Sequence, residues 1–133
     1  MEKLSEGLAA AARVRREELL DLAEGVASST SVAVTRGPSA ASVMLELEAP
    51  VGSFCFTEVV VTIAEVKVEG APGGGEGWGC ALGWDPEGAL ASALLDAEPT
   101  AAATSLAQRA LAEEEEERQR VRQAVAGTRV AAE

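Results

Sequence analysis

The spacing of apolar residues predicts helices at both ends of the chain. Steps of three and four residues, or their multiples, predict a helix over residues 3–24 with Gly25 as its stop. The apolar residues at this spacing are Leu4, Leu8, Ala11, Leu19 and Leu22. A last helix is predicted from Thr104 or Ser105 to about Ala126, where a dense run of charged residues leaves only a weak apolar face.

Alternation of apolar and polar residues predicts strands in the middle of the chain. Residues 31–36 and 43–48 are short strands on this criterion, separated by a turn at 37–39 that contains glycine and proline. A second turn is predicted at 49–52. The longest strand covers 54–69 and is apolar on both faces in its first half, but on one face only in its second half. This pattern is typical of a central strand whose first half is covered by helices or by a partner.

A glycine-rich hairpin loop at 71–75 leads into a return strand over 77–82. The loop is not followed by Lys-Ser or Lys-Thr or by a predicted helix start, so a phosphate-binding role is disfavoured. Asp85 and Pro86 mark the start of the next helix, because aspartate accepts hydrogen bonds from unpaired backbone N–H groups and proline suits the first helical position. That helix is predicted to end at residues 98–100.

Together these elements predict a single α+β domain over residues 1–133, with an antiparallel sheet of about four strands flanked by N-terminal and C-terminal helices. Apolar residues make up 47% of the chain, but only 3% of residues are aromatic. The core is therefore thin or is completed against a partner. The net charge of −11 disfavours nucleic acid and anionic membranes as partners. No apolar run is long enough to predict a membrane span, and charged residues interrupt the N-terminus where a signal peptide would be apolar.

Few residues have catalytic potential, since the chain contains neither histidine nor tyrosine. A histidine-based nucleophilic triad within the chain is excluded. Cys55 and Cys80 are expected to be buried thiols of a cytoplasmic protein, too far apart in a simple hairpin to form a disulfide. Glu58 is the best acid–base candidate, because burial among apolar neighbours would favour its protonated form. The favoured alternative is that Glu58 bonds a backbone group or a basic side chain.

Two other carboxylates and both tryptophans are also candidates. Asp85 is more simply a helix cap than a catalyst. Asp96 lies late in its helix, at the unfavourable end of the helix dipole, so it has a specific partner or is exposed. Trp78 and Trp84 flank the strand-to-helix corner and are favoured as core or interface anchors over ligand platforms. Taken alone, these residues do not define an enzyme.

Three blocks of sequence carry a family resemblance: FCFTEVVVTIAEVKV, GWGCALGWD and ALASALLDA. Their order and spacing resemble the PhnG family, a subunit of the bacterial carbon–phosphorus lyase system for phosphonate use. The matching positions are Glu58, Val61-Thr62, Gly79, Leu82-Gly83, Asp85 and Leu95-Asp96-Ala97, with looser matches at residues 34–36, 38, 43–47 and 128–130. Thr57, Ile63 and Trp84 depart from the family pattern, which has glycine at the first position and arginine at the other two. Any anion contact of the family at positions 63 and 84 is therefore in question.

The resemblance implies a non-catalytic accessory subunit in a two-fold complex with PhnI-, PhnH- and PhnJ-like subunits, which a PhnL-like protein also joins. It implies that the complex uses ATP and a phosphonate to form alpha-D-ribose 1-phosphonate 5-triphosphate, while this chain binds no cofactor itself. The apolar strand then becomes a subunit interface. The interface candidates are Phe54, Phe56, Val59, Val61, Trp78 and Trp84.

Two alternatives remain open from the residues alone. One is a stand-alone enzyme that uses Glu58 and Asp85 on a small phosphorylated substrate. The other is a small acidic interaction module unrelated to phosphonates.

Overall fold

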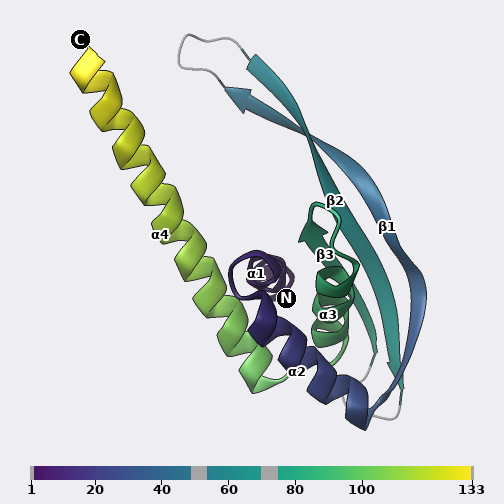
Figure 1. Cartoon of the computed structure of the whole chain (residues 1–133). Coiled ribbons are helices and arrows are strands. Elements are labelled where there is room, and N and C mark those ends of the chain that lie inside the picture. The colour runs from purple at the N-terminus through teal and green to yellow at the C-terminus, as the bar shows by residue number, and fades with distance from the viewer. Residues whose placement is uncertain (1, 49–53, 70–74, 133) are drawn as a thin grey trace.

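The computed structural model describes residues 2–48, 54–69 and 75–132, and the side chains of residues 4–44, 58–69 and 75–124. Two helices come first, then three strands, then two more helices (Figure 1). Their bounds are α1 (Glu2–Val14), α2 (Arg16–Ser29), β1 (Ser31–Glu48), β2 (Phe54–Glu69), β3 (Glu76–Leu82), α3 (Pro86–Ala97) and α4 (Ala101–Ala132). The α+β fold with an antiparallel sheet and flanking helices is confirmed.

The sheet has the strand order β1-β2-β3, and both pairs are antiparallel. It has three strands where the sequence predicts about four, because residues 31–36 and 43–48 belong to one strand of 18 residues. The predicted turn at 37–39 is a bulge: the register shifts on both sides of Arg36, and Gly37 has a φ of 74°. A bulge adds an unpaired residue and bends the strand without ending it.

The strands β2 and β3 differ in length, and this leaves half of β2 projecting. Residues 61–67 of β2 pair with β3, whereas residues 54–60 pair only with β1. The β1–β2 ribbon therefore runs on past the ends of β3 and α3 (Figure 1). Val60 is 47% exposed and Glu58 is exposed, so the described elements of this chain leave these two residues of the half predicted to be covered open to solvent.

Helix α3 packs on one face of the sheet through small residues. A Cβ atom at Gly77 or Gly79 would collide with the backbone of α3, which shows how closely β3 approaches that helix. On the same face of β2, Thr62, Ala64 and Val66 are fully buried or nearly so. Most buried apolar residues in the described part of the chain are alanines.

The N-terminal helix predicted over residues 3–24 is wrong as a single element. It breaks at Arg15, whose φ of −140° is not helical, and the second piece continues through Gly25 to Ser29. The break lets α1 lie against α4 and β3 while α2 lies against α3. Nothing lies within 4 Å of a Cβ built on Gly25, and the helix ends instead where the hydroxyl of Thr30 donates to the Val26 carbonyl.

The last helix is longer than predicted. α4 begins at Ala101, where the hydroxyl of Thr100 accepts a hydrogen bond from the Ala103 backbone N–H at 3.1 Å. Its first half lies beside α1, and its second half extends away from the sheet and the other helices (Figure 1). Among the described residues, none of the helices combines the length and apolar character that a membrane crossing requires.

Candidate functional site

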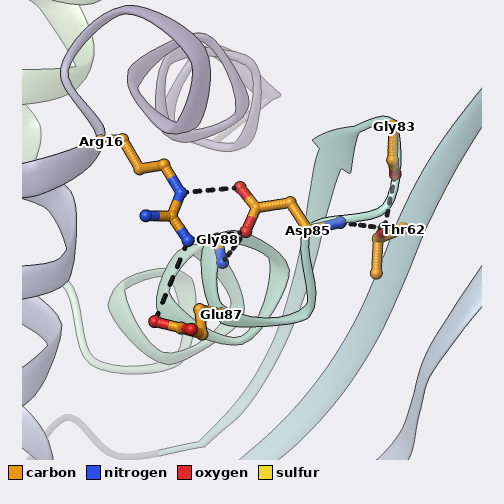
Figure 2. A network of polar contacts seen from close by, with 6 residues as sticks. All are labelled: Arg16, Thr62, Gly83, Asp85, Glu87 and Gly88. Atoms are coloured by element: carbon orange, nitrogen blue, oxygen red, sulfur yellow. Dashed lines mark hydrogen bonds and ion pairs between the residues drawn. The ribbon is translucent and has the colours of Figure 1, made fainter.

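Thr62 ties the end of β3 to the start of α3 (Figure 2). Its hydroxyl donates to the Gly83 carbonyl at 2.6 Å and accepts from the Asp85 backbone N–H at 2.8 Å. The Thr62 side chain lies on the helix-covered face of β2 and the residue is fully buried. Gly83 has a φ of 73°, a conformation that favours glycine, so the chain turns sharply here from strand into helix. One hydroxyl thus fixes the corner by satisfying two backbone groups.

Asp85 caps α3, as the sequence predicts. One carboxylate oxygen accepts from the Gly88 backbone N–H at 3.0 Å, and Pro86 occupies the first helical turn. The Arg16 guanidinium at the start of α2 reaches both carboxylate oxygens, at 3.1 Å and 3.0 Å (Figure 2). The hydrogen bond from Arg16, assisted by the Gly88 N–H, lowers the pKa of Asp85 despite its partial burial. Arg16 also lies 3.9 Å from Glu87, so α2 is clamped to the beginning of α3.

Asp96 has the specific partners that its position in the helix indicates. One oxygen accepts from the Trp78 backbone N–H at 3.0 Å, and the other accepts from the Ser5 hydroxyl at 3.3 Å. This carboxylate therefore connects α3 to both β3 and α1. The contact of Asp96 with Trp78 also satisfies a backbone donor at the edge of the sheet, a group that is costly to leave unpaired.

The structure does not bring Glu58 close to Asp85 along the strand. Glu58 lies four positions before Thr62 on β2, or roughly 13 Å at the usual strand rise, whereas the Asp85 backbone bonds Thr62 itself. Glu58 is exposed, opposite Met44 of β1. A catalytic role for Glu58 stays a prediction.

The face of the sheet opposite α3 carries a continuous apolar surface, which we call the far-face patch. It consists of Val43, Val59, Val61, Ile63, Cys80 and Leu82. Cross-strand pairing joins these residues: Val43 with Val59, Val61 with Leu82, and Ile63 with Cys80. None of them is fully buried, and Leu82 is 58% exposed. Apolar patches of this kind on a sheet face mark interaction surfaces.

A hollow of about 420 Å³ lies at the end of this patch, between β3, α1 and α4. Val61, Cys80 and Leu82 line it on the sheet side, while Ala9, Ala10 and Leu111 line it on the helix side. Partial burial raises the pKa of the Cys80 thiol, which is free. Cys80 pairs with Ile63 of β2, eight residues from Cys55 along the strand, so the expectation that these cysteines form no disulfide is confirmed.

The six interface candidates fall into three groups. Val59 and Val61 belong to the far-face patch and are half-buried. Trp78, within β3, is 42% exposed and Trp84, at the corner between β3 and α3, is 64% exposed, so neither is a core anchor. Phe54 and Phe56 lie on β2, but their side chains are outside the described residues.

Charged side chains link the helices in a way that local sequence did not indicate. Arg13 of α1 binds Glu114 and Glu117 of α4 at 3.3 Å and 3.1 Å, and Arg109 of α4 binds Glu18 of α2. The Arg109 contact lowers the pKa of Glu18. These pairs join residues about a hundred positions apart, and the contact of Arg16 with Asp85 spans 69 positions. Local sequence patterns therefore do not predict them.

In this region polar side chains connect the helices and strands to one another, and the partly exposed far-face patch lies beside them. Asp85 and Asp96 both engage groups of this chain. Within the described part of the chain, no three cysteine, aspartate or glutamate side chains converge as a metal site would require.

The chain matches a known protein family. The family model described as phosphonate metabolism protein PhnG matches residues 5–132. Among curated proteins, none matches the chain.

Proposed function

Because the chain belongs to the PhnG family of phosphonate metabolism proteins, we propose that it is an accessory subunit of the carbon–phosphorus lyase core complex. In this proposal it assembles with PhnI-, PhnH- and PhnJ-like subunits, and the complex converts ATP and a phosphonate to alpha-D-ribose 1-phosphonate 5-triphosphate. The partner subunits carry the chemistry, and this chain supplies scaffold and interface.

The far-face patch is the observation that carries the proposal. It places six apolar residues, Val43, Val59, Val61, Ile63, Cys80 and Leu82, on one contiguous sheet face, where the described elements of this chain leave each of them exposed or half-buried. Burial of apolar surface contributes about 25 cal/mol per Å², so a partner that covers this face is stabilised on it. The core beneath the opposite face rests largely on alanine, and this favours a chain that completes its burial in a complex.

The polar contacts support the same role. Asp85 and Asp96 are engaged in fastening α2, α3, β3 and α1 to one another. A scaffold subunit needs such rigid corners, because an interface built on fixed elements loses less conformational entropy on binding.

Co-expression of the chain with PhnI-, PhnH- and PhnJ-like subunits from the same organism tests the proposal. We expect a stable complex that contains the chain, and we expect Leu82→Asp to reduce its recovery, because a charge would enter the buried interface. Val34→Asp is the matched control. Val34 is 51% exposed, and because it pairs with the buried Val66 its side chain lies on the sheet face opposite the far-face patch. Both variants should be checked for folding by circular dichroism.

A folded monomer that ignores all three partners would count against the proposal. Equal recovery of complex with both variants would show that the far-face patch is not the interface.

A further inference from the structure

The projecting half of β2 has an open backbone edge on the side where β3 ends. The last backbone hydrogen bond on this side of β2 runs from the N–H of Gly83, just after β3, to the Val60 carbonyl, at 2.7 Å. Beyond it, residues 54–59 pair with β1 alone. This open edge is roughly 20 Å long at the usual strand rise of about 3.4 Å per residue.

The alternation of hydrogen bonds along β2 shows which backbone N–H and C=O groups face the open edge. In a strand, the N–H and C=O of one residue point to the same side, and this side alternates along the chain. The Val60 carbonyl accepts from Gly83 and the Val68 N–H donates to Gly75, so even-numbered residues of β2 point away from β1. The N–H and C=O groups of Phe54, Phe56 and Glu58 therefore face the open side, and among the described residues nothing bonds them.

The chain itself is turned away from this edge. Gly83 leaves the strand with a φ of 73°, and the Thr62 hydroxyl holds the Gly83 carbonyl and the Asp85 N–H in the corner. β3 therefore stops at Leu82 while β2 continues for seven residues. The space in line with β3 is left for another strand.

The outer edge of the sheet differs from this one. β1 carries a bulge around Arg36 that includes Pro38. A bulge and a proline at a sheet edge both discourage the addition of another strand. The open edge of β2 has neither a bulge nor a proline within residues 54–60, and its register to β1 is continuous. It also adjoins Leu82 and the far-face patch, so an added strand gains apolar contacts together with backbone hydrogen bonds.

We propose that an extended segment of a partner subunit adds to the sheet at residues 54–60 of β2, in line with β3. This inference rests on the proposed function, since it names how the partner binds. The added strand has apolar side chains next to Leu82 and Val60, and at least one lysine or arginine near Glu58.

Charge argues for a partner over a second copy of this chain. Each copy carries a net charge of −11, so two copies repel one another, whereas a basic segment is attracted. Glu58 is exposed on the open edge itself. Backbone pairing supplies the affinity in this mode of recognition, and alternate side chains supply the specificity.

Hydrogen exchange of single amides tests the proposal on the intact complex. The chain alone and the complex with PhnI-, PhnH- and PhnJ-like subunits are incubated in deuterated buffer, quenched, and read residue by residue by fragmentation mass spectrometry. In the chain alone, the N–H groups of residues 55, 57 and 59 are protected by β1, and those of 54, 56 and 58 exchange freely. In the complex we expect residues 54, 56 and 58 to become protected as well.

A pair of variants at one position supplies the binding measurement. Glu58→Pro removes an N–H that β1 does not use, and proline is tolerated where the missing N–H faces outward from an edge. Glu58→Thr removes the carboxylate equally but keeps the N–H. We expect E58P to bind the partner subunits about tenfold more weakly than E58T, with the exchange of residues 55, 57 and 59 unchanged in both free variants.

The outcomes separate this proposal from the function on which it rests. If the complex forms while residues 54, 56 and 58 still exchange freely, or if E58P binds as well as E58T, strand addition is refuted and the subunit role stands. If these amides become protected in the chain alone as its concentration rises, a second copy occupies the edge, and the proposed partner strand is refuted. If no complex forms, the proposed function fails and the partner strand with it.

Discussion

Replacement of Thr62 by valine tests whether one hydroxyl fixes the corner between β3 and α3. Valine has nearly the same shape as threonine, so the packing of this fully buried side chain is retained. The substitution removes the donor to the Gly83 carbonyl and the acceptor for the Asp85 N–H. Both backbone groups then lose their partner inside the protein.

The expected cost follows from these two contacts. A neutral hydrogen bond contributes about 0.5–1.5 kcal/mol net, and a buried group left without a partner costs about 1–3 kcal/mol. Gly83 and Asp85 are only half-buried, so water replaces part of the loss. We therefore expect Thr62→Val to lower the free energy of unfolding by about 2–4 kcal/mol. Thr62→Ser keeps the hydroxyl and removes one buried methyl group, at a cost of about 1 kcal/mol.

Urea denaturation followed by circular dichroism measures both variants against the parent chain. A loss of about 3 kcal/mol corresponds to a midpoint lower by about 1–3 M urea, given the slopes usual for small proteins. The expected order of stability is parent, then T62S, then T62V. A T62V protein at least as stable as T62S would refute the reasoning, because it would show that the hydroxyl contributes less than the methyl group.

Two further predictions follow from the same region. Asp85→Asn keeps an oxygen that can cap Gly88 but loses the ion pair with Arg16. The pKa of Asp85 is lowered from its ordinary value of 3.8. The stability that the Asp85 carboxylate contributes is therefore present above pH 3.8 and is lost as the pH falls through the lower folded-state pKa. The parent should therefore be more stable than D85N at neutral pH, and urea titrations should show the difference shrinking below pH 3.8; a difference that does not change with pH would contradict the ion pair. Gly79→Ala should destabilise the chain by about 1–3 kcal/mol, because its new Cβ would meet the backbone of α3. Gly75→Ala is the control, since nothing lies within 4 Å of its Cβ, and thermal unfolding that affects both variants equally would show that close packing is not the cause.

Local patterns predicted much of this fold and part of the site. The alternation over residues 54–69 identified β2 with its bounds, and the Asp85-Pro86 pair located the start of α3 and its cap. The position of Asp96 near a helix end indicated that it has a specific partner or is exposed, and it bonds the Trp78 N–H and the Ser5 hydroxyl. These features depend on neighbours within a few positions, which the sequence displays directly.

The errors share one physical cause. Glycine and proline at 37–39 are turn residues, but a strand that is held by pairing along its whole length can accommodate them as a bulge. The apolar spacing of residues 3–24 is helical throughout, yet α1 packs mainly against α4 and α2 mainly against α3, and the chain bends at Arg15 to reach both. Pairing and packing across the chain override local preference in each case.

By itself, the sequence determined the kinds of elements, their approximate positions and the resemblance to the PhnG family, because periodicity, caps and motif spacing are local properties. Only the tertiary structure decided where β3 stops beside β2, which sheet face α3 covers, and which carboxylates meet Arg16 and Trp78. A pattern of apolar residues records that a strand is to be buried, but it does not record by what. In this chain β2 is apolar along its first half, and tertiary pairing ends β3 beside Val61 and leaves Glu58 and Val60 exposed.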